Sequence, residues 1–288
     1  MSRTPTTTVA ELLRSKPQGL TAADRKLSHA LLSDYPVAGL GSMADFARAA
    51  GVSTPSVLRF AKKLGFSGLP AFQEALRREV SAQLQNPIAK DDRWSTKAPR
   101  AHILNSFADA ALDNLRTSLK LIDHKAFDGI VKLLSDRKRG VHVMGGRMTS
   151  HIASYLHTHL ALARPDVHLL PTAPAQWPQY LLDLGAGDVL VVFDVRRYDA
   201  RVHDFAASAR QRGAKIVLIT DQWMSPIARF AAFALPLRVE VPKSWDSNMV
   251  TLFAAEALVA AVVNMDWAAT QARIREIDAY YEIGRGSK

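Results

Sequence analysis

The feature that most constrains the fold is a repeated alternation of short apolar runs and helical stretches between residues 140 and 264. The runs are predominantly apolar, and none alternates polar and apolar residues over its whole length as a half-exposed strand does. Strands buried on both faces are typical of a parallel sheet with helices on either side. The sequence therefore predicts a doubly wound α/β domain with a five-stranded parallel sheet, its strands at 141–146, 166–171, 188–194, 214–220 and 233–241.

The loops after these strands are the expected ligand crevice, which in doubly wound domains lies at the carboxyl ends of the strands. After the first strand, glycines let backbone N–H groups approach an anion and the next helix adds its dipole. After the third strand, two adjacent arginines suit a phosphate or carboxylate. The candidate effector-binding residues are Gly145, Gly146, Arg147, Thr149, Ser150, Asp194, Arg196, Arg197, Tyr198, Gln222 and Ser247.

Each of these loops has a plainer interpretation as well. The glycine pair can be a tight βα turn, and the arginines can form a surface ion-pair cluster with Asp194 and Asp199. Helix capping is the alternative role for the polar residues near Gln222 and Ser247. The sequence leaves these alternatives open.

A second feature, at residues 42–65, predicts two short helices joined by a tight turn. Ser42 can cap the first helix, and Gly51 supplies the turn because a positive φ costs glycine little. Ser53 or Thr54 can cap the second helix. Pro55 fits its first turn, where a backbone N–H has no intrahelical partner.

The second of these helices has two faces. Val57, Phe60 and Leu64 share an apolar side, while Ser56, Arg59 and Lys63 share a polar, basic side. This is the pattern of a recognition helix, which packs on its partner helix and enters the DNA major groove. A solvated face of an ordinary helical hairpin is the alternative. The candidate DNA-binding residues are Ser53, Thr54, Ser56, Arg59, Lys62, Lys63 and Ser67.

The net charge of +10 is unevenly placed. Residues 1–80 contain 11 Lys/Arg and 6 Asp/Glu, a balance of +5, whereas the balance is +4 over residues 81–139 and +1 over 140–288. An excess of positive charge around the predicted recognition helix favours a polyanionic partner such as double-stranded DNA. We therefore predict an all-α DNA-binding domain at 1–84, a linker at 85–100 and the α/β domain at 101–288.

Several classes of site and location are disfavoured. The chain contains no cysteine, which excludes disulfides and thiolate chemistry and fits a reducing compartment. No secretory signal is visible, and the longest apolar run, at 249–263, is interrupted by Thr251 and Glu256. We expect a cytoplasmic protein without a membrane partner and without a cofactor.

Three of the nine histidines fall on one predicted helix, at His151, His157 and His159. Histidines six and eight positions apart on a helix rarely converge on one ion, and no carboxylate-paired ligand set accompanies them. We expect core or surface histidines here rather than a metal site.

Both halves of the chain resemble one family. The stretch SMADFARAAGVSTPSVLRFAKKLGFSGLPAF is similar to the helix–turn–helix of the RpiR family of bacterial transcription regulators. The segments VHVMGG and GAKIVLITDQWMSPIA are similar to the sugar-isomerase (SIS) domain that follows in that family. The resemblance implies binding to a DNA operator as a homodimer or homotetramer, usually in repression, with a phosphosugar or related metabolite as effector.

The sequence departs from that pattern after the third strand. A typical SIS domain has a hydroxyl-rich loop of the form Ser-x-Ser-Gly-x-Thr there, whereas this chain has FDVRRYD. We therefore expect an anionic effector, either sugar-derived or a carboxylate. The alternative function is a sugar-phosphate isomerase or lyase with an accessory helical domain. Its base would have to be Glu240 or Glu256, and no obvious histidine accompanies either; we therefore predict that the protein is not an enzyme.

Overall fold

The structure is a computed structural model that describes residues 7–15, 19–84, 102–242 and 245–283. These residues pack into two compact units. The first unit comprises the described residues up to Ile122 together with Thr220–Arg229 and Pro236–Val250, and the second comprises Asp123–Ile219, Phe230–Leu235 and the described residues from Thr251 on. The predicted linker at 85–100 lies outside the described residues, and the predicted domain limits stay a prediction.

The N-terminal part of the first unit is helical, as predicted. Its elements are α1 (Val9–Arg14), α2 (Ala22–Ser33), the 3-10 turn η1 (Val37–Gly39), α3 (Met43–Ala50), α4 (Thr54–Lys63) and α5 (Leu69–Leu84). A buried aromatic cluster joins three of these helices, because the ring of Phe46 lies 6.4 Å from that of Phe60 and 6.3 Å from that of Phe72. Apolar residues of α1, α2 and α4 complete the same core.

The turn between α3 and α4 forms as the sequence predicts. The Ser42 hydroxyl accepts a hydrogen bond from the Asp45 N–H at 3.1 Å, which caps α3. Gly51 ends α3 in the left-handed conformation, with φ of 60° and ψ of 45°. The apolar side of α4 is then buried, since Val57 and Phe60 are fully covered.

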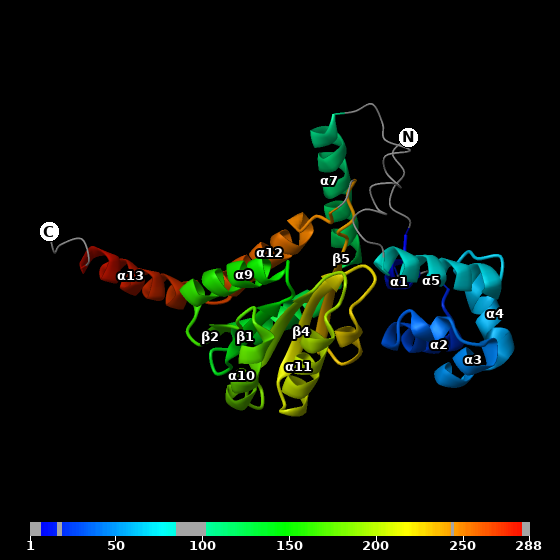
Figure 1. Cartoon of the computed structure of the whole chain (residues 1–288), viewed down its shortest axis with the longest axis horizontal. Coiled ribbons are helices and arrows are strands. Elements are labelled where there is room, and N and C mark those ends of the chain that lie inside the picture. The colour runs from blue at the N-terminus through cyan, green and yellow to red at the C-terminus, as the bar shows by residue number, and fades with distance from the viewer. Residues whose placement is uncertain (1–6, 16–18, 85–101, 243–244, 284–288) are drawn as a thin grey trace. The chain divides into compact units, whose positions relative to one another are not determined.

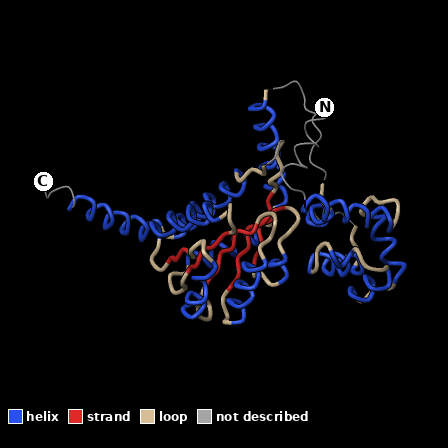
Figure 2. Tube along the Cα trace, in the orientation of Figure 1, coloured by secondary structure: helices blue, strands red, loops and turns tan. Residues whose placement is uncertain are grey.

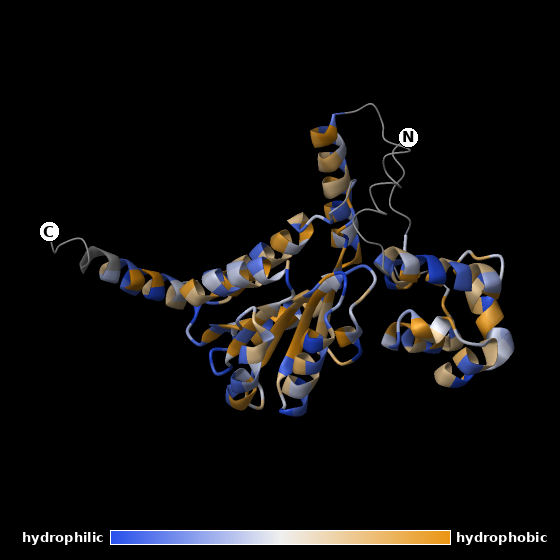
Figure 3. Ribbon diagram, in the orientation of Figure 1, coloured by the Kyte–Doolittle hydropathy of each residue, from blue (hydrophilic) through white to orange (hydrophobic). Residues whose placement is uncertain are grey.

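A single five-stranded sheet forms the α/β part, visible in red in Figure 2. The strands, in spatial order, are β2 (Val167–Leu169), β1 (Val141–Gly145), β3 (Val189–Asp194), β4 (Lys215–Asp221) and β5 (Phe233–Leu237). β1 pairs in parallel with β2 on one side and with β3 on the other. The strands are among the most hydrophobic segments in Figure 3, as expected for strands covered on both faces.

Helices cover both faces of this sheet (Figure 1). The helices of the α/β part are α7 (Ile103–Leu121), α8 (His124–Ser135), α9 (Ser150–Ala163), α10 (Trp177–Asp183), α11 (Ala200–Gln211), α12 (Met249–Met265) and α13 (Trp267–Ile283). Short 3-10 turns, η2 (Pro174–Gln176) and η3 (Pro226–Arg229), complete the connections. From β1 the chain moves outward to β2, and then returns across β1 to β3 and on to β5. The topological switch point of the sheet therefore lies between β1 and β3.

The predicted bounds of the first four strands differ from the structure by one or two residues, and the end of the fifth differs by four. The fifth strand was expected to reach residue 241 but ends at Leu237. The next three residues hydrogen-bond elsewhere: the Arg238 N–H donates to the Ser118 hydroxyl at 2.9 Å, and the Glu240 carbonyl accepts from the Asn114 side chain at 2.7 Å.

Among the described residues, no single helix is long and apolar enough to cross a membrane. Helices α12 and α13 meet the length and composition criteria only when taken together, and the chain bends by 103° between them.

Candidate functional site

The exposed face of α4 is the candidate DNA-reading surface. Ser53 stands at the N-cap, Thr54 lies in the first turn, and Arg59 and Lys62 follow one and two turns later; all four are exposed. The Arg59 guanidinium donates to the Ser56 hydroxyl at 3.0 Å, and that hydroxyl also lies 3.0 Å from the Ser53 hydroxyl. These contacts hold the arginine against the helix with its remaining N–H groups available for a base edge.

The reading face is turned relative to the face that the sequence predicts. Ser56 is only 7% exposed, so its role is to hold Arg59 rather than to present an open hydroxyl. Leu58, which is absent from the predicted set, is 39% exposed beside Arg59. Its signal was present in the sequence, because a leucine that follows the buried Val57 by one position turns away from the core. An exposed apolar side chain there matches the methyl group of thymine.

The two lysines at the end of α4 differ in their surroundings. Lys62 is exposed, whereas the Lys63 ammonium donates to the Asp24 carboxylate at 2.6 Å and to the Gly19 carbonyl at 2.8 Å. Burial acts to raise the pKa of Asp24, but the hydrogen bonds from Lys63 and Thr21 outweigh it and lower that pKa. Lys63 therefore fastens α4 to α2. Ser67, in the turn before α5, is exposed.

The β1–α9 loop is held against the end of β3 in the second unit. The Thr149 hydroxyl donates to the Phe193 carbonyl at 2.7 Å and accepts from the Gly146 N–H at 2.9 Å. Gly145 has no room for a side chain, because a Cβ there would lie 2.6 Å from the Thr149 carbonyl carbon. The loops after β1 and β3 are thus brought together at the switch point of the sheet.

The two loops present cationic side chains at this point. Arg147 and Arg197 are exposed, and Arg196 and Tyr198 are half-buried. Arg196 and Arg197 both have left-handed backbone, with φ of 50° and 46°, which residues other than glycine adopt at a cost of about 1–3 kcal/mol each. Two such residues in succession are typical of a loop whose shape serves binding.

The acidic residues of the β3–α11 loop are engaged within the chain. Asp194 is 3% exposed at the end of β3. Asp199 caps α11 through the Arg201 N–H at 2.9 Å and forms an ion pair with the Arg201 side chain at 2.6 Å. The hydrogen bond from that side chain is the main reason that the pKa of Asp199 is lowered. Asp199 is therefore paired with Arg201, and not with the two arginines that precede it.

A small cavity of about 210 Å³ opens beside the first loop. It is lined by Gly145, Ser150, His151, Ala153, Ser154, Leu169, Leu170 and Thr172. The Ser150 hydroxyl donates to the Arg147 carbonyl at 3.2 Å, which leaves its lone pairs directed outward as acceptors. This cavity gives a neutral part of a ligand a place next to the cationic loops.

Gln222 and Ser247, two of the predicted effector-binding residues, belong to the first unit. The Gln222 side-chain oxygen accepts from the Val239 N–H at 3.2 Å, and the Ser247 hydroxyl accepts from the Met249 N–H at 3.2 Å. Both residues are more than 90% buried. Ser247 has the capping geometry that was the alternative interpretation of its role.

The predicted histidines show no shared ligand geometry. The ring of His159 lies 4.2 Å from the ring of Tyr155, whose hydroxyl donates to the Glu256 carboxylate at 3.0 Å. Over residues 7–15, 19–84, 102–242 and 245–283, no three histidine, aspartate or glutamate side chains converge in a way that would hold a metal ion.

With this geometry in place, comparison with known proteins assigns the chain to a family. The helix-turn-helix domain of the rpiR family matches residues 7–83, and the SIS domain matches residues 133–261. The chain belongs to the RpiR family. The HTH-type transcriptional regulator HexR of Pseudomonas aeruginosa is 27% identical over 243 residues, which cover 83% of this chain and 81% of that protein.

Solved structures similar to this RpiR-family chain support the same fold. The sugar isomerase domain of an RpiR transcription factor from Sphaerobacter thermophilus has a TM-score of 0.56 at 22% identity, covering 61% of this chain and 97% of that chain. The Vibrio vulnificus NanR protein complexed with ManNAc-6P has a TM-score of 0.55 at 18% identity, covering 96% and 100%. At these identities the likeness concerns the fold alone. The family models and the curated relative, and not these structures, identify the protein as a helix-turn-helix transcription regulator with an SIS domain.

Proposed function

We propose that this regulator binds its operator through the exposed face of α4. We propose also that its affinity for the operator rises or falls when an anionic metabolite binds at the β1–β3 switch point. The family resemblance favours repression over activation of the target genes. Such a protein works in the cytoplasm, where bacterial DNA lies.

The DNA-binding part rests on the chemistry of the α4 surface. Arg59, held by Ser56, matches the O6 and N7 acceptors of guanine. Leu58 matches a thymine methyl group, while Ser53, Thr54, Lys62 and Ser67 serve phosphates around that contact. Lys63, which is already bound to Asp24, contributes through the position of α4 and only weakly as a phosphate ligand.

The effector part rests on the site between β1 and β3. Ligands of doubly wound sheets bind at this switch point, and here it carries Arg147, Arg196 and Arg197. Guanidinium groups bind carboxylates and phosphates with two parallel hydrogen bonds, so the class of ligand is a small anion. The Vibrio vulnificus NanR protein is complexed with a phosphosugar, ManNAc-6P. We propose a phosphosugar, a sugar acid or a carboxylate for this chain.

We also propose that the protein acts as a homo-oligomer. Helix α7 buries Ala111, Asn114 and Ser118 along one face, and the same face continues toward its N-terminus as Leu104 and Phe107, which are 68% and 39% exposed. An exposed apolar stripe of this kind fits a second copy of the chain. A homodimer would set the spacing of two reading helices on the operator.

The observation that carries the regulatory function is the exposed Arg59–Leu58 face on a helix whose other side is fully buried. Its test is selection of a preferred operator from random duplexes with the full chain, followed by fluorescence anisotropy titration. Arg59→Ala should weaken operator binding by about 1–3 kcal/mol and relax the preference at one base pair. Arg78→Ala, on the exposed surface of α5, is the matched control. Operator affinity that is equal in wild type and Arg59→Ala would contradict the role of α4.

The effector site has a separate test. The double variant Arg196→Ala/Arg197→Ala should lose the change in operator affinity that an anionic metabolite produces, while its affinity without metabolite stays close to that of the wild type. Thermal-shift measurements with sugar phosphates, sugar acids and small carboxylates identify the metabolite first. A double variant that responds like wild type would remove the arginines from the site.

A further inference from the structure

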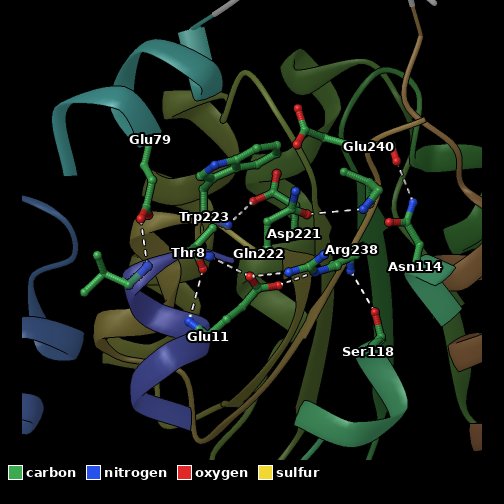
Figure 4. Close-up of polar contacts among 12 residues, drawn as sticks. Thr8, Glu11, Glu79, Asn114, Ser118, Asp221, Gln222, Trp223, Arg238 and Glu240 are labelled. Atoms are coloured by element: carbon green, nitrogen blue, oxygen red, sulfur yellow. Dashed lines mark hydrogen bonds and ion pairs between the residues drawn. The ribbon is translucent and has the colours of Figure 1, made fainter. Parts of the chain in front are cut away.

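A buried ion pair inside the first unit ties the N-terminal helix to the chain segment that follows β5. The Arg238 guanidinium binds the Glu11 carboxylate with two hydrogen bonds, Nε to Oε1 at 2.6 Å and Nη2 to Oε2 at 2.8 Å (Figure 4). Their side chains are 4% and 2% exposed. Water therefore screens this pair very little, unlike the surface ion pairs of the same unit.

At the Glu11 end, the pair is fixed to the DNA-reading helices. Glu11 closes the capping box of α1, because its carboxylate accepts from the Thr8 N–H at 2.7 Å. Val9 and Leu13 of α1 are buried in the same core as Phe60 of α4. The Val9 N–H also donates to the Glu79 carboxylate of α5 at 2.7 Å. A displacement of Glu11 thus displaces α1 against the core that supports the reading helix.

At the Arg238 end, the neighbouring residue is hydrogen-bonded to two buried residues, Gln222 and Ser247. The neighbouring Val239 donates its N–H to the Gln222 side chain at 3.2 Å and accepts the Ser247 N–H at 2.8 Å. The Arg238 N–H donates to Ser118 of α7. Residues 238–240 are therefore held on both sides, and Figure 4 shows Arg238 in contact with both Glu11 and Ser118.

We infer that the Glu11–Arg238 pair couples the segment 236–250 to the DNA-reading helices. A conformational change in either of them is then transmitted to the other through α1. Stability alone is a poor reason for such a pair, because two buried charges often stabilise a fold no better than well-packed apolar side chains. Defined geometry between two elements is a better reason, since two parallel hydrogen bonds fix both distance and orientation. This inference rests on the proposed DNA-binding role of α4.

Thermodynamic linkage provides a test that needs no knowledge of the effector. If the segment 236–250 influences operator affinity, then operator binding must influence that segment equally. Amide hydrogen exchange of the full chain, with and without the selected operator, measures this directly. In the wild type we expect DNA to change the exchange of the Arg238 and Val239 amides by about fivefold or more, the lower end of common allosteric coupling.

The variant Glu11→Gln/Arg238→Met removes both charges of the pair together, so neither of these two charges is left buried without the other. Glutamine also retains the capping oxygen for α1. This variant should bind the operator while the DNA-induced change at residues 238–239 disappears. Glu74→Gln, which removes an exposed charge on α5, should retain the change.

The outcomes separate cleanly. A wild-type protein that binds the operator without any change at 238–239 overturns the link, and so does a double variant that shows the full wild-type change. Absence of operator selectivity in the wild type contradicts the proposed function itself. The single variant Glu11→Gln, followed by thermal melting, checks the contact independently, because loss of the negative charge opposite the buried Arg238 should lower the melting temperature more than the double variant does.

Discussion

The reading helix and the strand-end loops place their functional side chains in different ways. On α4, helical periodicity places Arg59, Lys62 and Leu58 on the exposed side once Val57 and Phe60 are buried. At the switch point, loop shape depends on contacts between distant residues, such as the Thr149 hydroxyl with the Phe193 carbonyl. A local pattern therefore specifies the first site, and tertiary packing specifies the second.

This difference predicts that the stability of the protein is more sensitive to one added methyl group in the β1–α9 loop than on the exposed face of α4. Gly145→Ala would place a Cβ 2.6–2.7 Å from backbone atoms of Thr149 and Ser150, which cannot be relieved by a side-chain rotation. We expect the free energy of unfolding to fall by about 2–3 kcal/mol. Urea denaturation of the full chain measures this loss.

Gly146→Ala is the matched control, because its Cβ would lie 3.6 Å from the Thr149 hydroxyl, an ordinary contact. It should stay within about 0.5 kcal/mol of wild type. Equal stability of the two variants would show that the loop yields easily and that its packing does not fix its shape.

In the helical region, the partly buried Glu79 has a property that depends on packing and not on the local sequence, namely its pKa. Burial raises the pKa of this carboxyl from 4.5 to about 7, and its partners are the Tyr35 hydroxyl and the Val9 N–H. The folded chain holds a proton there that the unfolded chain releases above pH 4.5. Stability should therefore fall as the pH rises from about 4.5 to 7. Each pKa unit of the shift corresponds to at most about 1.4 kcal/mol of stability. Because solvent reaches part of the side chain, we expect the total loss of unfolding free energy to be smaller than this limit implies, about 2–3 kcal/mol.

Glu79→Gln removes this titration and keeps a hydrogen-bond acceptor. Denaturation at a series of pH values should then show a flatter profile for the variant, with Glu74→Gln following the wild type. Parallel profiles for Glu79→Gln and wild type would mean that Glu79 is charged in the folded protein.

A smaller change is expected for Leu58 on the reading helix. If periodicity alone places it on the reading face, then removing the methyl group of one thymine in the operator, by substitution with deoxyuridine, should weaken binding about fourfold. That corresponds to about 0.8 kcal/mol for one buried carbon group. Leu58→Ala should bind the thymine and deoxyuridine operators equally, as anisotropy titration would show. A fourfold preference that persists in Leu58→Ala would assign the methyl contact to another residue.

Much of the fold could be predicted from the sequence, because it follows from local patterns. The Gly51 turn, the cap at Ser42 and the five apolar strands all follow from residue type and spacing. The strand end at Leu237 could not be predicted, since the valines at 239 and 241 extend the pattern of a strand, whereas in the fold Arg238 bonds to Glu11 and the backbone of residues 238–240 bonds outside the sheet.

The candidate sites were predictable to different degrees for the same reason. The sequence located both strand-end loops, but not the left-handed backbone of Arg196 and Arg197, which only the surrounding fold imposes. On α4, helical periodicity assigned Ser56 and Lys63 to the open basic face, whereas their contacts with Arg59 and Asp24 depend on packing. The residue types therefore predicted which segments form the candidate sites, but the hydrogen-bond and ion-pair partners of the side chains could not be predicted from the sequence.

The most direct measurement is the operator affinity of the full chain with and without each anionic metabolite identified by thermal shift. We expect at least one phosphosugar, sugar acid or carboxylate to change the dissociation constant by about fivefold or more, and Arg196→Ala/Arg197→Ala to abolish the change. A protein that binds its operator selectively, yet with the same affinity in the presence of every stabilising anion, would contradict the proposed coupling of the two sites.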